Sequence, residues 1–177
     1  MNVLSLFDGI SIAQQSLKEL NIPVEKYYAS EIDKYAISIT QKNFPNTIQL
    51  GDIKNIKGED FTNIDLIIGG SPCQDLSIAK KNRKGLKGNR SSLFYEFVRL
   101  VKEVKPRYFI LENVNSMPKE DKETITKELF GIEPIMINAA LVSAQNRKRL
   151  FWVGKRVEDT YERVEISQPE DKGILLK

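Results

Sequence analysis

The stretch Leu66-Ile67-Ile68-Gly69-Gly70-Ser71-Pro72-Cys73-Gln74 joins an apolar run to the single cysteine of the chain. The apolar run predicts a buried strand, and open α/β sheets bind their ligands at the carboxyl ends of such strands. A thiolate in that crevice is a strong nucleophile, and Pro72 stiffens the loop that presents it. A free cysteine is also often a small buried residue that fills core space. The stretch alone leaves both interpretations of Cys73 open.

Strands and helices are expected to alternate on both sides of this stretch. Apolar runs predict strands at residues 3–7, 27–30, 47–50, 65–68, 108–111, 135–137 and 150–153. Apolar residues at helical spacing predict helices that begin near Ile12, Ile32, Leu93 and Pro118. The alternation indicates an α/β fold with a doubly wound, mostly parallel sheet that helices cover on both faces. Residues 156–177 are polar and show no clear period, so a tail is expected after residue 154.

Composition narrows the possible chemistry. The chain has 177 residues, which suffice for one domain with a substantial core. No apolar run approaches the length of a membrane span and no signal pattern opens the chain, so we expect a cytoplasmic protein. One cysteine excludes an intrachain disulfide and a multi-cysteine zinc site. The absence of histidine excludes Ser-His-Asp hydrolases, Cys-His proteases and histidine-ligated metals, and no metal site is expected.

Six short motifs along residues 7–153 resemble those of the DNA (cytosine-5) methyltransferases, and they occur in that family's order. They are Phe7-Asp8-Gly9-Ile10, Glu31, Asp52-Ile53, Pro72-Cys73-Gln74, Glu112-Asn113-Val114 and Gln145-Asn146-Arg147-Lys148-Arg149 with Val153. The form Gly-Ser-Pro-Cys-Gln-Asp-Leu-Ser, beginning at Gly70, is most similar to the de novo branch and its phage-type relatives. The resemblance implies a Rossmann-like S-adenosylmethionine-dependent fold and methylation of DNA, including restriction–modification roles.

The first strand–loop–helix turn is the expected cofactor site. Glu31 follows the loop at the predicted end of the second strand, where a carboxylate can accept both ribose hydroxyls of an adenosine. The loop from Asp8 to Ser11 has one glycine, which disfavours the pyrophosphate of NAD and suits phosphate-free S-adenosylmethionine. Strand-end carboxylates are also often merely solvated. With the family resemblance, the expected cofactor residues are Phe7, Asp8, Gly9, Ile10, Ser11, Glu31, Ile32, Asp52, Ile53 and Pro72.

The resemblance also implies a covalent mechanism. Cys73 would attack C6 of cytosine, Glu112 would contact N3, and Arg149 would bind O2 with Arg147 as its neighbour. Glu112 is expected just past the end of the strand at residues 108–111. Residues two apart on a strand point to one face, so both arginines are expected to aim at one site. A surface position for Glu112 and a simple turn cluster for the arginines are the alternatives.

A basic segment follows the cysteine. Net charge is only +3, but residues 80–90 contain six basic side chains and no acidic one. Such a run is usually a solvated loop; here its glycines and its nearness to Cys73 favour closure over a phosphate backbone. The residues expected to contact DNA are Gln74, Ser77, Lys80, Lys81, Arg83, Lys84, Lys87 and Arg90.

The family's target-recognition region and closing motif have no match in residues 155–177, which resemble at most the start of such a region. Three hypotheses therefore remain. The first is a methyltransferase catalytic domain that is weak or inactive alone and is completed by a second segment or chain. The second is an inert cofactor- or DNA-binding regulatory module, or one half of a split enzyme. The third is a nucleotide-dependent oxidoreductase, which the glycine-poor loop disfavours.

Overall fold

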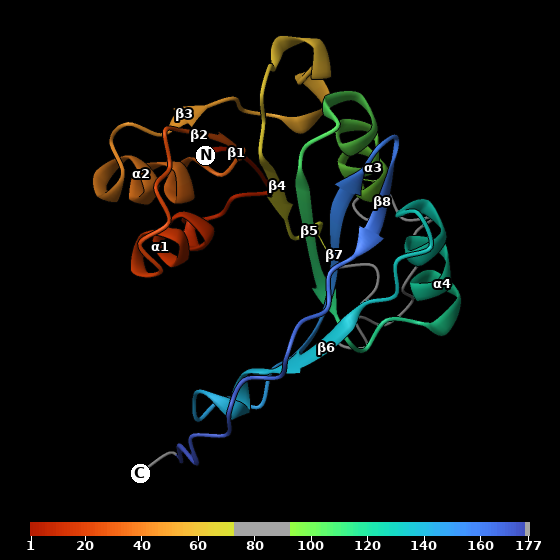
Figure 1. The fold of residues 1–177 in the computed structure, drawn as a ribbon. Coiled ribbons are helices and arrows are strands. Elements are labelled where there is room, and N and C mark those ends of the chain that lie inside the picture. The colour runs from red at the N-terminus through yellow and green to blue at the C-terminus, as the bar shows by residue number, and fades with distance from the viewer. Residues whose placement is uncertain (73–92, 176–177) are drawn as a thin grey trace.

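The structure is a computed structural model, and it describes residues 1–72 and 93–175. Seven strands form a sheet in the order β3-β2-β1-β4-β5-β7-β6, and an eighth strand, β8, pairs with β7 (Figure 1). The parallel strands are β1 (Asn2–Leu6), β2 (Lys26–Ser30), β3 (Ile48–Gln49), β4 (Leu66–Gly69) and β5 (Tyr108–Val114). The antiparallel part consists of β7 (Lys148–Val157) with β6 (Ile135–Asn138) on one side and β8 (Thr160–Arg163) at its end.

Helices lie on both sides of the sheet. Helices α1 (Ile12–Glu19) and α2 (Lys34–Asn43) lie on one side in Figure 1, and α3 (Leu93–Val104) and α4 (Lys119–Glu128) on the other. Short 3₁₀ turns, η1 (Ile53–Asn55) and η2 (Gly58–Asp60), connect β3 to β4, and η4 (Ala139–Leu141) follows β6. The predicted α/β class, with a mostly parallel sheet, is confirmed. No helix in the described part of the chain has the length and apolar character needed to cross a bilayer.

The main core lies between the sheet and the pair α3 and α4. Phe94, Phe97 and Leu100 of α3 are fully buried, as are Phe109 of β5 and Trp152 of β7. Burial of one such side chain contributes about 1.5–3 kcal/mol, so this face supplies most of the apolar stabilisation. A smaller buried cluster, formed by Val3, Tyr27, Ala29 and Leu66, lies on the opposite face.

The sheet extends further than the sequence indicated. β7 runs to Val157, and β8 pairs with it beyond residue 154, where a tail was expected. Tyr161 anchors β8 because its hydroxyl donates to the Pro106 carbonyl at 2.8 Å and its ring packs on Phe109. This burial raises the pKa of Tyr161 to about 12. Assignment of the later residues to a target-recognition region stays a prediction.

The expected helix starting at Ile32 begins later. Asp33 is the N-cap of α2, and its carboxylate accepts hydrogen bonds from Tyr35 N and Ala36 N at 2.9 Å each. An aspartate in this position satisfies amides that the helix itself leaves unpaired. Ile32 therefore lies in the connection between β2 and α2, where it is 74 % exposed.

Candidate active site at the carboxyl edge of the sheet

The loop after β1 has an unusual backbone. Phe7, Gly9 and Ser11 all have positive φ angles, of 57°, 58° and 61°. Positive φ is uncommon for residues other than glycine and is found preferentially at functional sites. Side chains hold this shape: the Asp8 carboxylate accepts hydrogen bonds from the Tyr27 hydroxyl at 2.8 Å and from the Ser11 hydroxyl. The loop is therefore fixed before any ligand binds.

Glu31, directly after β2, ties the loop to the next connection. Its Oε2 accepts a hydrogen bond from Gly9 N at 2.8 Å. Its Oε1 accepts two more, from Ile32 N at 2.8 Å and Asp33 N at 2.9 Å. Each carboxylate oxygen offers two lone-pair positions, so Oε2 can accept one further donor from a ligand. Glu31 thus both shapes the loop and offers an oriented acceptor.

A pocket of about 140 Å³ opens beside Glu31. Six of the expected cofactor residues line it: Phe7, Glu31, Ile32, Asp52, Ile53 and Pro72. Ser30 and Leu93 also line it and were not expected from the sequence. Ser30 is the last residue of β2 and directly precedes Glu31, and this position in the sequence could have indicated that it lines the pocket. Leu93 comes from α3, and only the tertiary structure brings it here.

A larger cavity of about 700 Å³ lies on the other side of the loop and reaches the catalytic candidates. Asp8, Gly9 and Ile10 line it together with Glu112 and Arg147. Ser11 lines neither cavity, because it is fully buried beneath Asp8. Phe7 lines both cavities, so Glu31 and Asp52 border one space beside the loop and Asp8 and Glu112 border the other.

Glu112 lies inside β5, where the sequence had placed it just beyond the strand. β5 pairs with β4 only as far as Leu111, but it continues against β7 as far as Val114. Val114 lies opposite Arg149, so Glu112 and Arg149 are diagonal neighbours on one face. Arg149 Nε is 2.6 Å from Glu112 Oε1, and the two side chains are 21 % and 35 % exposed. The sheet register thus builds a charge-assisted pair at this edge.

The segment leading to Cys73 lies against this pair. A Cβ on Gly70 would come within 2.8 Å of Glu112 Oε2, so the absence of a side chain permits the close approach. Asn113, which is 1 % exposed, donates from Nδ2 to Ser71 Oγ at 3.1 Å. Its Oδ1 accepts from Val114 N at 2.8 Å, which fixes the amide orientation. Asn113 was quoted in a motif but given no role, because its partner is distant in sequence.

Arg147 is placed differently from Arg149. β7 begins at Lys148, so Arg147 precedes the strand and the expectation that both arginines share a strand face was wrong. Its backbone is held by Asn138, whose Oδ1 accepts from Arg147 N at 3.0 Å. The Arg147 side chain is exposed and borders the larger cavity. Both arginines line a polar hollow with Asn115 and Ser116, but only Arg147 also borders the larger cavity.

Some expected site residues cannot be placed, since they lie outside the described residues. They are Cys73, Gln74, Ser77, Lys80, Lys81, Arg83, Lys84, Lys87 and Arg90. Within residues 1–72 and 93–175, no group of three or more acidic, histidine or cysteine residues could hold a metal ion.

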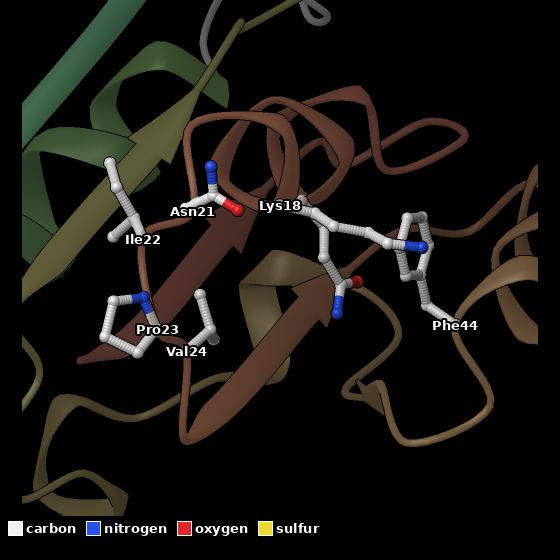
Figure 2. A pocket seen from close by; sticks show the side chains of 7 residues that line it. Lys18, Asn21, Ile22, Pro23, Val24 and Phe44 are labelled. Atoms are coloured by element: carbon white, nitrogen blue, oxygen red, sulfur yellow. The ribbon is translucent and has the colours of Figure 1, made fainter.

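Another hollow, of about 410 Å³, lies away from these residues, between the ends of α1 and α2 (Figure 2). Ile22, Pro23 and Val24 form one wall, and Lys18 lies over the ring of Phe44 at 6.0 Å. Its lining is mostly apolar and contains no acid or nucleophile. This hollow lacks the chemistry of the carboxyl edge.

The mostly parallel sheet, the loop after β1 and the acid–arginine pair at one edge form a Rossmann-like α/β fold with a candidate site at the carboxyl ends of its strands. Residues 1–173 match the family model of C-5 cytosine-specific DNA methylases, and the chain belongs to that family. The family predicted from the sequence motifs is confirmed.

The relatives are phage and bacterial enzymes. The chain is 34 % identical over 173 residues to the orphan methyltransferase M.Rho11sI of Bacillus phage rho11s, covering 92 % of this chain and 34 % of the relative. It is 30 % identical over 188 residues to the type II methyltransferase M.Bsp6I of Bacillus sp., covering 100 % of this chain and 59 % of that protein. The chain thus spans between about a third and three fifths of these relatives.

Solved methyltransferase structures share this fold. A DNA modification methyltransferase encoded within an E. coli prophage superposes with a TM-score of 0.68 at 29 % identity, over 88 % of this chain and 47 % of that one. The S. pombe Dnmt2 methyltransferase gives 0.64 at 20 % identity, over 88 % and 49 %. The second likeness bears on the fold alone.

Proposed function

We propose that this chain carries the cofactor-binding and catalytic residues of a DNA cytosine-5 methyltransferase. The observation that carries the proposal is the Glu112–Arg149 pair, which lies against Gly70 three residues before Cys73. A cytosine that contacts this pair would present its N3 to Glu112 and its O2 carbonyl to Arg149. Family membership adds the reaction class, transfer of a methyl group to C5 of cytosine.

The pocket beside Glu31 suits the adenosine part of S-adenosylmethionine. Glu31 Oε2 can accept a ribose hydroxyl, and Asp52 can accept the adenine amino group. Ile32 and Ile53 provide apolar surface for the purine ring. Two carboxylates at a pocket mouth disfavour a phosphate by charge repulsion, which argues against a dinucleotide. When bound, S-adenosylmethionine supplies an electrophilic methyl group on sulfur.

The chemical role of the chain is to make cytosine C5 nucleophilic. The Cys73 thiolate adds to C6, the C5–C6 π pair forms a C4–C5 double bond, and the C4–N3 π pair moves to N3 and is shared with O2. Glu112 donates a proton to N3 as negative charge develops there and recovers it when C5 takes the methyl group, while Arg149 binds O2. After C5 has gained the methyl group, water removes the C5 proton. The sulfur–C6 bond then breaks, and its electron pair returns to the thiolate of Cys73.

DNA is the proposed substrate, and the target base must leave the duplex to reach Glu112. Extruding a base costs a few kcal/mol, which contacts to the phosphate backbone help to offset. Gln74, Ser77 and the basic residues from Lys80 to Arg90 are proposed to make such contacts. Arg147, Lys148 and Arg149, which line a polar hollow with Asn115 and Ser116, are proposed to add further phosphate contacts.

Trapping the covalent adduct tests this proposal. The chain is incubated with S-adenosylmethionine and a duplex that contains 5-fluorocytosine, alone and with the remaining segment of a relative supplied in trans. Fluorine replaces the C5 proton and blocks elimination, so mass spectrometry should find the DNA attached to Cys73. The variant Cys73→Ser should give no adduct in either arm. An adduct at another residue, or none in both arms, would refute the mechanism.

A further inference from the structure

Arg99, on the face of α3 that turns toward η1 and η2, is held by two acids of its own helix. Its Nη2 and Nε lie 2.8 and 2.9 Å from Glu96 Oε2, and its Nη1 lies 2.8 Å from Glu103 Oε2. These contacts fix the plane of the guanidinium. A group with several donors in a fixed fork can then present its remaining N–H groups in defined directions.

The remaining donors of Arg99 contact the connection between β3 and β4. Nη2 donates to the Ile56 carbonyl at 2.9 Å and to the Ile53 carbonyl at 3.3 Å. Glu103 reinforces this attachment, because its Oε2 also accepts from Gly58 N at 2.9 Å. A Cβ on Gly58 would lie 2.3 Å from Glu103 Cβ, so η2 can approach α3 only with glycine there.

The connection that Arg99 holds includes one wall of the pocket beside Glu31. Asp52 is the N-cap of η1, and its Oδ1 accepts from Lys54 N at 3.0 Å, which leaves Oδ2 for a ligand. Ser30 holds the other end, since its hydroxyl donates to the Gly51 carbonyl at 2.8 Å. Asp52 is therefore fixed by Ser30 on one side and by Arg99 on the other.

We propose that Arg99 is a positioning residue for adenine recognition: it sets the place of Asp52 and Ile53 through the carbonyls of Ile53 and Ile56. This inference rests on the proposed function of the pocket as the cofactor site. Arg99 does not line that pocket. Its effect should therefore appear as a loss of discrimination between purines and not as a lost contact.

The test uses two ligands that differ at one group, S-adenosylhomocysteine and its deaminated analogue S-inosylhomocysteine. The analogue has a carbonyl where adenine has the amino group that Asp52 would accept. Calorimetry on Arg99→Lys should show the adenosyl ligand weakened about five-fold, the effect of one hydrogen bond. Binding of the inosyl ligand should change little, so the preference between the two falls.

Two further variants separate positioning from general damage. Lys102 lies on the same helix as Arg99 and forms an ion pair of 3.3 Å with Glu128 of α4. Lys102→Ala removes this pair and should leave the affinities for both ligands unchanged. Ser30→Ala releases the other end of the wall and should reproduce the lost preference even if Arg99→Lys folds poorly. In an Asp52→Ala background, Arg99→Lys should have no further effect, because the two residues act as one unit.

The outcomes are distinguishable. Equal weakening of both ligands by Arg99→Lys, or additive effects with Asp52→Ala, would show that Arg99 supports the fold only and would overturn the inference. If the unaltered chain binds the adenosyl ligand and Glu31→Gln binds it about ten-fold more weakly, the proposed cofactor site stands independently. An unaltered chain that binds neither ligand would overturn the site and the inference together.

Discussion

The two halves of the sheet hold their candidate residues in different ways. In the parallel half, from β3 to β4, Phe7, Glu31 and Asp52 lie in the connections that follow the strands, and backbone amides hold the carboxylates. In the half formed by β5 and β7, Glu112 and Arg149 lie within the strands, and they hold each other. Loop geometry holds the candidate residues of the parallel half, and strand register holds those of the antiparallel half.

This difference has consequences for rigidity. A carboxylate bonded to three backbone amides cannot turn without disturbing the chain around it. A partly exposed ion pair can exchange its partner for a ligand, because both side chains remain accessible. The parallel half is therefore suited to holding a cofactor in one pose. The antiparallel half is suited to groups that must adjust as charge develops on a base.

The variant Glu112→Gln should distinguish most clearly between the roles of the two halves of the sheet. We expect methyl transfer to fall by about 10² to 10⁴, the usual contribution of a group that handles a proton in the transition state. Affinity for S-adenosylhomocysteine should be unchanged, because Glu112 does not line the pocket beside Glu31. Single-turnover transfer measures the first quantity and calorimetry the second. Glu128→Gln, at a surface ion pair on α4, is the matched control.

A smaller effect is expected from Arg149→Lys. Lysine keeps the positive charge but not the planar fork, so it can neutralise Glu112 without binding both partners. Transfer should fall about 10²-fold, as when one donor of an oxyanion site is lost. Arg163 of β8 forms an ion pair of 3.8 Å with Glu165, and Arg163→Lys is the control variant. Equal activity of the two variants would exclude Arg149 from the reaction.

The sequence predicted the parallel half well because its logic is local. An apolar run ends, an acid follows, and carboxyl ends of parallel strands meet at one edge. This reasoning located Glu31 and Asp52, which the structure brings to one pocket. It failed for Glu112, because β5 continues to pair with β7 after its pairing with β4 has ended. Pairing with a strand some 40 residues later in the chain leaves no local signal.

Two other features required tertiary structure. The hairpin formed by β7 and β8 was missed because most of its residues beyond Gly154 are charged or exposed, and Tyr161 alone anchors it in the core. The arginine that holds η1 was missed because its carbonyl partners lie more than 40 residues earlier in the chain. The roles assigned to Cys73 and the basic segment remain predictions, since those residues lie outside the described ranges.

Glu31→Gln should affect the parallel half alone. Glutamine has only one side-chain oxygen that can accept hydrogen bonds. Its NH₂ group must therefore face either Gly9 N or the amides of Ile32 and Asp33, and the hydrogen bonds on that side are lost. We expect affinity for S-adenosylhomocysteine to fall about ten-fold, equivalent to 1.4 kcal/mol. Asp33→Asn is the neighbouring control, because asparagine also caps helices well. Titration calorimetry on both variants would show whether the cofactor affinity depends on Glu31 specifically.

The smallest effect distinguishes two buried tyrosines, one in each half. Tyr27 supports the loop after β1 through Asp8, and Tyr161 anchors the antiparallel hairpin. Replacing either with phenylalanine removes one hydrogen bond and should lower the free energy of unfolding by about 1 kcal/mol at pH 7. Only Tyr27→Phe should also weaken S-adenosylhomocysteine binding, because only Tyr27 contacts the loop.

Alkaline pH sharpens the same comparison. Burial, and then the negative charge of Asp8, raise the pKa of Tyr27 well above its ordinary value of 10.0. Burial raises the pKa of Tyr161 to about 12. A pKa raised on folding stabilises the protein fully below the unfolded value near 10, and this stabilisation is lost as pH rises toward the folded value. Urea unfolding between pH 9 and 11 should therefore show a steeper loss of stability in the unaltered chain than in either phenylalanine variant. The flattening should be about equal for the two variants up to pH 11, because both folded pKa values lie above this window. A variant with the same pH dependence as the unaltered chain would show that its tyrosine has the same pKa in the folded and unfolded states.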